Sequence, residues 1–356
     1  MRQSLKCLIA AGGTFGHVAP SLAVAEALRR RGAQVTFAGS PDRVEARLVP
    51  EAGYEFDSFR IAGLPRQPGL ALVRAVALAL RAPVACMEIL SRRRPDVVLG
   101  GGGYVAGPMV AAAAARRIPA ALMEADAHLG LANRLAAPFA RRVFLAFPIY
   151  GLDGAKYRVT GRPIPARSRV VARADARRLF GLPPDGAVLL VFGGSQGAHA
   201  LNEAIVDAFA HGGPAVLHLA GERDYVALRP RVERQDYRLL AFTDDFGAAL
   251  TAADVAVARA GGSVWELAAA GLPAVLVPFP HATADHQTKN ARYFADRGGA
   301  IVVPESQLAR VPALVRELLA DSERLAAMAT AMRNAARPDA AEEIAEELIT
   351  LATARR

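Results

Sequence analysis

Three glycine-rich segments are the parts of this sequence best suited to binding a phosphate. They lie at 12–16 (GGTFG), 100–103 (GGGG) and 193–197 (GGSQG), each directly after a short apolar run. Glycines let a backbone approach a phosphate closely, and a following helix offers unpaired amide groups and a partial positive charge. One such loop is often only a tight turn. Three of them at the carboxyl ends of parallel strands would face one crevice, so we predict a diphosphate site there.

A second group of polar residues follows in the C-terminal half. Ser263 and Glu266 lie where a predicted helix begins, and Gln287 and Asn290 are three residues apart on another. We expect Ser263 to help hold a phosphate and Glu266 to accept hydrogen bonds from ribose hydroxyls. The two amides share one helix face and can both donate to and accept from sugar hydroxyls. Each residue alone is equally consistent with a cap or a surface polar group, but together they favour a nucleotide-sugar pocket.

The glycine spacing argues against a dinucleotide or ATP site. Segment 12–16 lacks GxGxxG, and the next predicted strand ends at Gly39 and Ser40 rather than at an acidic residue. Glu222, which follows a later strand, is only a weak candidate for that acid. The pattern GxxxxGK[ST] does not occur, and Cys7 and Cys86 have no metal-ligand spacing. We expect neither a cofactor nor a metal ion.

The elements that position these residues form two α/β repeats. Strands are predicted at 5–10, 34–38, 97–99, 120–123, 143–147, 187–192, 215–220, 255–257 and 273–277, and helices at 20–31, 198–210 and 340–354. Both repeats open with strand, GG[ST]xG and helix, and the stiff segment 161–165 (GRPIP) separates them. We predict two Rossmann-like domains facing a cleft: residues 1–161 with a C-terminal helix at 338–356, and residues 162–337.

Charge is distributed unevenly between the two halves. The total is +9; residues 1–160 hold 21 Lys and Arg against 11 Asp and Glu, or +10, and residues 161–356 hold 22 against 23, or −1. The asymmetry indicates an anionic partner for the first half, such as lipid headgroups, nucleic acid or a phosphorylated substrate, although an arginine-rich composition would also raise the charge. Two cysteines fit a reducing compartment, and we expect no targeting segment or membrane-spanning run.

One apolar run has features of a membrane-docking helix. Residues 70–80 (LALVRAVALAL) are apolar apart from Arg74 and are flanked by Arg66, Arg81 and the arginines at 92–94. Eleven residues do not span a bilayer. Docking on anionic lipid and burial in the core are about equally consistent with the pattern. We expect Pro83 to end or kink this helix.

Several stretches resemble the MurG family, whose members move N-acetylglucosamine (GlcNAc) from UDP-GlcNAc onto lipid I. The matching stretches are GGTFGHVAPSLAVAEAL, LVPEAG, DVVLGGGGYVAGP, GGSQGAHALN, FTDDF, RAGGSVWELAAAGLPAVLVPFPHATADHQTKNA and the helical tail. They occur in family order, and GGSQGA and DHQTKNA are the most diagnostic. The resemblance implies the two-domain GT-B fold, in which the N-terminal domain takes the acceptor, the C-terminal domain takes UDP-GlcNAc, and no metal is needed.

The resemblance also implies roles for individual residues. Those implied for the donor diphosphate, uracil, ribose and sugar are Gly194, Ser195, Gln196, Phe242, Thr243, Ser263, Glu266, Gln287, Asn290 and Arg162. Those implied for the acceptor are Thr14, Gly16, His17, Gly103, Tyr104, Glu124 and Asn133.

Four positions depart from the family pattern. Phe15 replaces a glycine, and Asp126 stands where the family has asparagine. Pro165 occupies the place of an arginine, and Arg162 and Arg167 are the two candidates to replace it. The segment around Ser263 is one residue shorter than in the family, so that match is loose.

The implied reaction is a single inverting displacement by a muramyl 4-hydroxyl, which needs a general base. His17 is our first choice, because a helix N-terminus keeps an imidazole neutral near pH 7. Binding of acceptor phosphate or helix capping by His17 is almost as consistent with the sequence, and Glu124 and Asp126 are rival bases.

We therefore predict a peripheral enzyme on the cytoplasmic face of the membrane that makes lipid II for peptidoglycan. The predicted partners are UDP-GlcNAc, lipid I and an anionic membrane surface, and not nucleic acid. The alternatives are another GT-B enzyme, either a glycolipid glycosyltransferase or a UDP-GlcNAc 2-epimerase, and a non-catalytic nucleotide-binding module.

Overall fold

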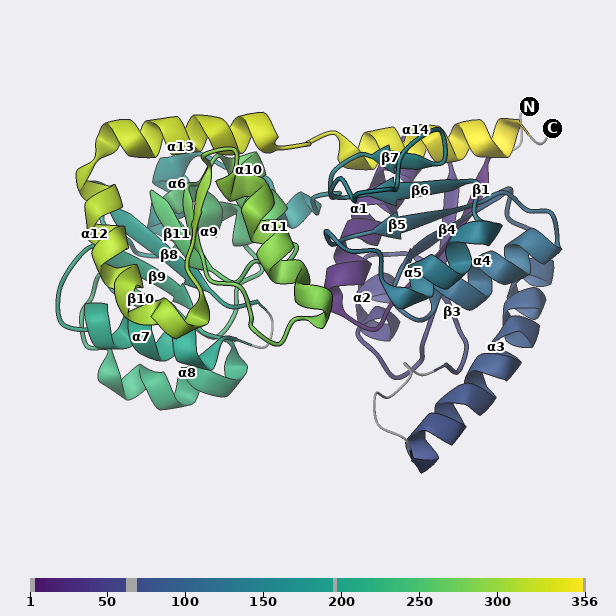
Figure 1. Ribbon diagram of the computed structural model, residues 1–356, viewed down its shortest axis with the longest axis horizontal. Helices are drawn as coiled ribbons and strands as arrows, with labels where there is room; N and C mark the ends of the chain where they lie inside the picture. Colours follow the sequence, from purple (N-terminus) through teal and green to yellow (C-terminus); the bar gives the residue numbers. More distant parts are fainter. Residues whose placement is uncertain (1–3, 62–68, 195–196, 355–356) are drawn as a thin grey trace. The chain divides into compact units, whose positions relative to one another are not determined.

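The chain folds into two compact α/β units, which Figure 1 shows in a computed structural model that describes residues 4–61, 69–194 and 197–354. Unit 1 comprises Met1–Pro165 and Pro338–Arg356, and unit 2 comprises Ala166–Arg337. The division falls after Pro165, so Arg162 belongs to unit 1 rather than to the segment in which the sequence analysis placed it. Ser195, Gln196 and Arg66 lie outside the described residues.

Unit 1 is built on a parallel sheet of seven strands in the order β3-β2-β1-β4-β5-β6-β7. The strands are β1 (Lys6–Ala11), β2 (Gln34–Gly39), β3 (Glu55–Ser58), β4 (Val97–Gly102), β5 (Ala120–Glu124), β6 (Arg142–Leu145) and β7 (Tyr157–Val159). The helical elements are α1 (Phe15–Arg30), α2 (Glu45–Glu51), α3 (Leu70–Arg93), α4 (Ala106–Ala115), α5 (Leu131–Ala136), η1 (Ala137–Phe139) and α14 (Ala340–Thr353).

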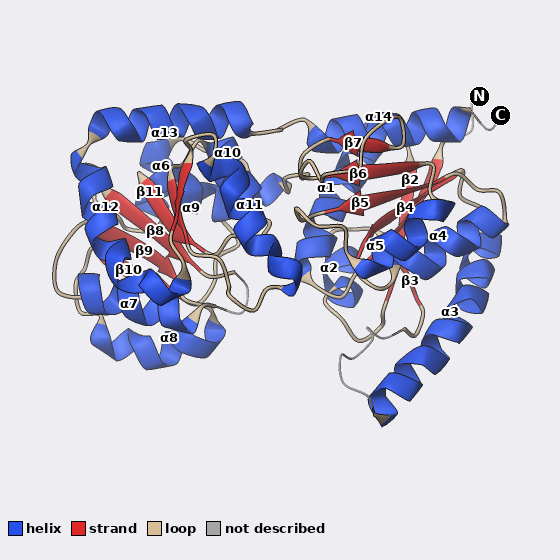
Figure 2. Ribbon diagram, viewed as in Figure 1, coloured by secondary structure: helices blue, strands red, loops and turns tan. Residues whose placement is uncertain are grey.

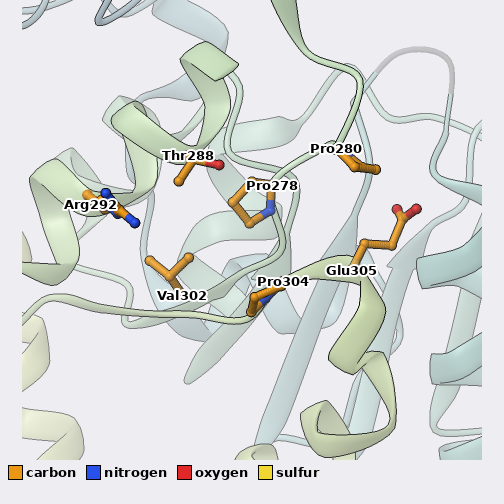
Figure 3. Close-up of a pocket in the computed structure, with 7 residues that line it drawn as sticks. All are labelled: Pro278, Pro280, Thr288, Arg292, Val302, Pro304 and Glu305. Atoms are coloured by element: carbon orange, nitrogen blue, oxygen red, sulfur yellow. The ribbon is translucent and has the colours of Figure 1, made fainter. Parts of the chain in front are cut away.

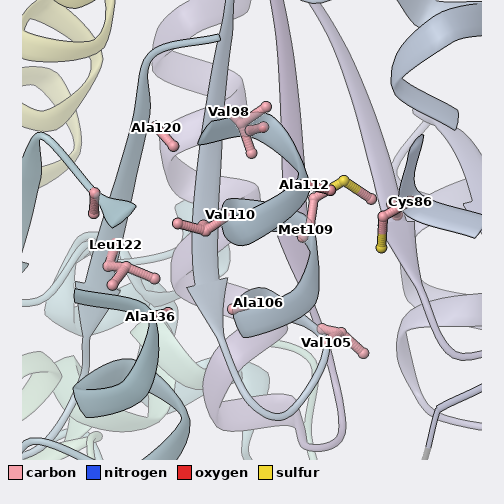
Figure 4. Packing of buried hydrophobic residues seen from close by; sticks show 14 of the residues in the cluster. Cys86, Val98, Val105, Ala106, Met109, Val110, Ala112, Ala120, Leu122 and Ala136 are labelled. Carbon is pink, nitrogen blue, oxygen red and sulfur yellow. The ribbon is translucent and has the colours of Figure 1, made fainter. Parts of the chain in front are cut away.

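Both faces of this sheet are covered, which explains why its central strands are uninterrupted apolar runs. Along β1, Cys7 and Ile9 pack toward α1 and α14, whereas Leu8 and Ala10 pack toward α3 and α4. Figure 4 shows part of the second cluster, with Met109 of α4 beside Cys86 of α3.

The C-terminal helix α14 completes unit 1 rather than unit 2. Ile344 and Leu348 are fully buried against α1, and Glu342 forms ion pairs with Arg30 and Arg31 at the end of α1. Leucine and isoleucine side chains buried in this way each stabilise a fold by about 1.5–3 kcal/mol. The helix predicted at 340–354 therefore serves as a cover for the first sheet.

Unit 2 repeats the design with six parallel strands in the order β10-β9-β8-β11-β12-β13 (Figure 2). The strands are β8 (Val188–Phe192), β9 (Ala215–Leu219), β10 (Tyr237–Leu240), β11 (Val255–Ala258), β12 (Ala274–Leu276) and β13 (Ala300–Val302). The helices are α6 (Arg173–Leu179), α7 (His199–Phe209), α8 (Glu222–Leu228), α9 (Phe246–Ala252), α10 (Val264–Ala270), α11 (His286–Ala295), α12 (Val311–Ala320) and α13 (Ser322–Ala335), with short η2 (Ala166–Ser168), η3 (Arg229–Arg231), η4 (Thr283–Asp285) and η5 (Glu305–Arg310).

The strand order reverses once in each sheet, between β1 and β4 and between β8 and β11. Ligands of open parallel sheets bind outside the carboxyl ends of strands at such a switch point. The glycine-rich segments follow β1 and β8 and form the end of β4, and therefore lie at these two points.

Two helix boundaries predicted at prolines were wrong. Helix α1 begins at Phe15 rather than near Pro20, so Pro20 lies inside it. Helix α3 does not end at Pro83 but continues to Arg93, and the alternative that Pro83 kinks it stays a prediction. Within the described part of the chain, no helix is both long and apolar enough to cross a membrane.

Candidate functional site

The glycine segments at 12–16 and 100–103 pack against each other at the switch point of unit 1. The amide of Gly12 donates to the carbonyl of Gly102 over 3.4 Å. Gly103 has a φ of +75°, and a Cβ there would lie 2.1 Å from the carbonyl oxygen of Gly12. A larger residue at 103 would push the two loops apart, so the glycines serve loop packing as well as a ligand.

A buried carboxylate closes the first loop from within. Glu45, at the start of α2, is fully buried; its Oε2 accepts from the amide of Gly13 and its Oε1 from the amide of Ser40, each over 3.0 Å. A Cβ on Gly12 would lie 2.1 Å from Oε1. The prediction that this loop cradles a phosphate is therefore wrong for Gly13, whose amide already binds an acid of the protein itself.

His17, in the first turn of α1, is held in the form that a general base requires. Its Nδ1 lies 3.2 Å from the carbonyl of Gly12 and 3.1 Å from Oγ1 of Thr14. A carbonyl only accepts, so Nδ1 carries the hydrogen and the lone pair of Nε2 is the basic site. Burial lowers the pKa of His17; Asp126 opposes that shift and Arg162 adds to it. The imidazole is thus neutral near pH 7.

Arg162 ties the His17 loop to the end of β5. Pro20 has no amide hydrogen, so the carbonyl of Gly16 lacks its helical donor, and the Nη2 of Arg162 donates to it over 2.7 Å. The Nη1 of Arg162 donates to the carbonyl of Ala125 over 3.4 Å. Its place is therefore in unit 1 beside Gly16.

Glu124 has a structural role. Its buried carboxylate accepts from the amides of Ala125 (2.9 Å), Asp126 (3.3 Å) and Gly130 (2.9 Å), and from Nδ2 of Asn133 (2.9 Å). Burial raises its pKa, and the hydrogen bonds from Gly130 and Asn133 oppose that rise. Four donors leave little room for proton transfer, so Glu124 is a poor base. Of the two rival carboxylates, Asp126 is the one placed to influence His17.

Among the described residues of unit 1, three side-chain polar atoms are buried without a hydrogen-bond partner. They are Oδ1 of Asn133, which lies on α5, and the hydroxyls of Tyr104 and Tyr54. A Cβ on Gly13 would lie 3.0 Å from Cε1 of Tyr104, so this ring packs against the first loop. Unpaired buried polar atoms are rare in folded proteins and call for a ligand or a water molecule.

In unit 2, the structure describes the glycine loop at 193–197 on both sides of Ser195 and Gln196. Gly194 and Gly197 have φ values of +90° and +75°, which favour glycine. The amide of Gly197 donates to the carbonyl of Gly194 over 3.0 Å. The loop then leads into α7, whose first amide groups have no partner within the helix.

A polar cluster lies around Glu266 on α10. The hydroxyl of Ser168 donates to Oε1 of Glu266. Burial lowers the pKa of Arg167, and the nearby charge of Glu266 opposes this shift. The guanidinium carbon of Arg167 lies 6.0 Å from the ring centre of Phe242, within cation–π range. Of the two arginines that the sequence left open, Arg167 is the one found here.

The remaining described donor candidates are Ser263, Thr243, Gln287 and Asn290. Ser263 caps α10 without a side-chain hydrogen bond, and Oγ1 of Thr243 accepts from the amide of Asp245 over 3.1 Å. Oε1 of Gln287 accepts from the amide of Phe279 over 2.9 Å, which leaves its amide hydrogens for a ligand. Asn290 is fully buried and donates to the carbonyl of Ala260 over 3.1 Å. Its side chain supports the backbone in this structure, and the expectation that it reads sugar hydroxyls stays a prediction.

A cavity of about 380 Å³ lies beside α11, at the carboxyl ends of β12 and β13 (Figure 3). It is lined by Pro278, Pro280, Thr288, Arg292, Val302, Pro304 and Glu305. None of the donor candidates lines it. Among the described residues, no three His, Cys, Asp or Glu side chains are grouped as a metal ion would require.

Comparison with known proteins shows the family of this chain. Residues 7–145 match the glycosyltransferase family 28 N-terminal domain, and residues 188–344 match its C-terminal domain. A Nocardioides protein is 42% identical over 98% of both chains; it is named UDP-N-acetylglucosamine–N-acetylmuramyl-(pentapeptide) pyrophosphoryl-undecaprenol N-acetylglucosamine transferase. The chain belongs to the MurG family. It is therefore a glycosyltransferase with the GT-B fold that the sequence predicted.

Solved structures support the MurG assignment over the epimerase alternative. Acinetobacter baumannii MurG superposes with a TM-score of 0.78 at 31% identity, covering 97% of this chain and 99% of that one. A UDP-GlcNAc 2-epimerase from Neisseria meningitidis superposes with a TM-score of 0.67 but only 14% identity, covering 97% and 100%. The second likeness shows the fold alone.

Sequence reasoning missed Glu45 and Ser168, because neither lies in a glycine loop or beside another polar candidate.

Replacing Glu45 by glutamine should destabilise unit 1. The glutamine amide group would place N–H hydrogens against one of the two backbone donors. An unsatisfied buried donor costs about 1–3 kcal/mol, and we expect a loss of that size in the free energy of unfolding measured in urea. Glu51→Gln, at the exposed end of α2, is the control, and equal stability of the two variants would contradict the role assigned to Glu45.

Proposed function

We propose that this chain transfers GlcNAc from UDP-GlcNAc to the muramyl 4-hydroxyl of N-acetylmuramyl-(pentapeptide) pyrophosphoryl-undecaprenol. The observation that carries the proposal is a half-buried neutral histidine, His17, between two glycine loops of a family 28 fold, in a chain 42% identical to a transferase of that name. A base and a nucleotide-sugar domain are the two parts that an inverting transfer needs.

The chemistry assigned to His17 is proton removal during a single displacement. Nε2 takes the proton of the acceptor hydroxyl as its oxygen attacks the anomeric carbon, and UDP leaves with the electron pair of the broken bond. The carbonyl of Gly12, which accepts from Nδ1, keeps the ring oriented and favours the positive charge that it gains. Asp126 favours the same charge, because its electrostatic effect raises the pKa of His17.

The donor is assigned to unit 2. Glu266 has a second carboxylate oxygen beyond the one that Ser168 binds, and both oxygens can accept from ribose hydroxyls. Arg167 and Phe242 lie on the same side of this cluster and offer a cation and an exposed ring to the nucleotide. The leaving diphosphate is stabilised by the backbone amides at the start of α7, since they carry partial positive charge.

The acceptor is assigned to unit 1. Oδ1 of Asn133 and the hydroxyl of Tyr104 are buried without partners, and an acceptor sugar supplies the hydroxyls that would pair with them. Thr14, Gly16 and Gly103 surround His17 in the two loops and complete this site by position.

A peripheral place on the cytoplasmic face of the membrane, against anionic lipid, follows from the lipid-linked acceptor. Some of the arginines that could bind lipid headgroups already form ion pairs within the protein. Arg92 and Arg93 form ion pairs with Asp57, and Arg93 also pairs with Glu55, so part of their charge is neutralised. Within 70–80, the side chains other than that of Leu78 lie outside the described part of the chain. Exposed Arg81 and Arg94 are the better residues to mutate in vesicle binding.

A transfer assay tests the proposed function. Radiolabelled UDP-GlcNAc and a short-chain lipid I analogue should give a β-1,4-linked disaccharide product with release of one UDP per transfer. UDP-GlcNAc without acceptor should be turned over far more slowly. Interconversion of UDP-GlcNAc with its 2-epimer and no transfer would favour the epimerase alternative, and binding without turnover would favour a non-catalytic module.

The acid limb of the pH profile tests His17. Because burial lowers its pKa, the imidazole stays neutral below the ordinary histidine value of 6.5, and activity should fall only as the pH drops through that lowered pKa. His17→Ala should reduce kcat at least about 100-fold and leave the UDP-GlcNAc KM within about threefold. Exposed His211→Ala is the control. A near wild-type rate for His17→Ala would exclude it as the base.

Glu266→Ala tests the ribose assignment. Loss of a carboxylate that accepts two hydroxyl hydrogen bonds should weaken UDP binding by about 10- to 100-fold in calorimetry. Glu317→Ala, on the exposed face of α12, should bind UDP like the wild type. Unchanged affinity in Glu266→Ala would remove Glu266 from the donor site.

A further inference from the structure

A chain of buried polar side chains crosses unit 2 from β10 to α8. His218 on β9 is fully buried; its Nδ1 lies 2.9 Å from the hydroxyl of Tyr237, and its Nε2 lies 3.0 Å from Oδ1 of Asn202. Nδ2 of Asn202 donates to the carbonyl of Ala220 and to Oδ2 of Asp224, each over 2.8 Å. The side chains of His218 and Asn202 therefore join four elements, β9, β10, α7 and α8.

The direction of each hydrogen bond in this chain is fixed. Both hydrogens of the Asn202 amide are used by Ala220 and Asp224, so Oδ1 of Asn202 must accept. Nε2 of His218 therefore carries the hydrogen, and Nδ1 accepts from the hydroxyl of Tyr237. Burial lowers the pKa of His218 to about 3, so the ring is neutral at any pH at which the enzyme works.

This chain of hydrogen-bonded side chains ends directly against the glycine loop at 193–197. A Cβ on Gly197 would lie 2.4 Å from the carbonyl oxygen of Ala220 and 3.6 Å from Nδ2 of Asn202. Asn202 also lies in the first turn of α7, where its backbone amide donates to the carbonyl of Ala198 over 2.8 Å. Gly197 therefore lies against both the Asn202 side chain and the carbonyl that this side chain binds.

We propose that His218 is a positioning residue for the donor, which acts through Asn202 to hold the Gly197 end of the loop and the start of α7 where the diphosphate of UDP-GlcNAc binds. The inference rests on the proposed function for the identity of the donor. His218 touches no substrate. Without it, Oδ1 of Asn202 would lose its buried donor, the amide could rotate, and Ala220 and Gly197 would lose their fixed spacing.

Two substitutions at His218 separate the two hydrogen bonds of its ring. In His218→Gln, the amide nitrogen replaces Nε2 and keeps the bond to Asn202 while the bond from Tyr237 is lost. In His218→Asn, the shorter side chain replaces Nδ1 and keeps the bond from Tyr237 while the bond to Asn202 is lost. Tyr237→Phe removes only the bond from the Tyr237 hydroxyl. Every variant loses one hydrogen bond from the same buried chain, so loss of core stability alone does not predict which variant binds the donor poorly.

The experiment measures the KM for UDP-GlcNAc, the KM for the lipid I analogue and the melting temperature of the full chain. His218→Asn should raise the donor KM about tenfold, while His218→Gln and Tyr237→Phe stay within about twofold of the wild type and the acceptor KM is unchanged in all three. A donor KM that follows the melting temperature across the variants, or equal values for His218→Asn and His218→Gln, would overturn the proposal.

The wild-type protein distinguishes this inference from the proposed function. If the wild type transfers no GlcNAc, the proposed function fails, and the variants are compared by the dissociation constant for UDP in calorimetry. Weaker UDP binding in His218→Asn alone would then still support a positioning role for His218. Equal binding in all variants would overturn it.

Discussion

The contact between a glycine-rich loop and a polar group buried beneath it is the constraint on which both sites depend. In unit 1 the buried group is the carboxylate of Glu45, and in unit 2 it is the carbonyl of Ala220. Each lies where a side chain on the loop would have to be, so only glycine fits. Each is also fixed by partners of its own, because an unpaired buried carboxylate or carbonyl would cost more than the loop gains by packing on it.

This shared constraint gives the two loops different surroundings. The carboxylate of Glu45 accepts from the amide of Gly13 and lies beneath the backbone of the first loop. The carbonyl of Gly12 in the same loop accepts from Nδ1 of His17 and orients its ring. A loop of this kind suits a base and a sugar hydroxyl better than a diphosphate. In the second loop the buried contact is with the Cα of Gly197, and the backbone amides at the start of α7 stay available for an anion. The two GG[ST]xG segments are therefore similar in sequence but differ in their buried contacts, and we propose different roles for them.

The sequence predicted the features that depend on local pattern. Uninterrupted apolar runs such as 187–192 marked central strands, because both faces of a parallel sheet are covered. The glycine segments and His17 were singled out because they are adjacent in the chain, and the role of His17 as the base stays a prediction. The short edge strands β3, β7, β10 and β13 were not predicted, since edge strands have less buried surface and a weaker pattern. The extent of α1 and α3 was missed because proline was read as a helix breaker, whereas Arg162 supplies the donor that Pro20 cannot.

Features that depend on distant residues were beyond the sequence. Glu45 lies 32 residues from Gly13, and Arg167 lies far along the chain from Glu266. Glu124 and Asn290 were given roles at the ligand because their residue types suit them; their buried hydrogen bonds also hold the backbone, and the roles stay predictions. Residue type indicates what a side chain can bind, and only its neighbours decide whether it is already occupied.

A crystal structure of the protein with UDP-GlcNAc tests most directly the claim that the two loops differ. We predict that the diphosphate contacts backbone amides of unit 2 at the start of α7, and that Oε2 of Glu45 still accepts from the amide of Gly13. A diphosphate bound to the amide of Gly13, with Glu45 displaced, would contradict the account.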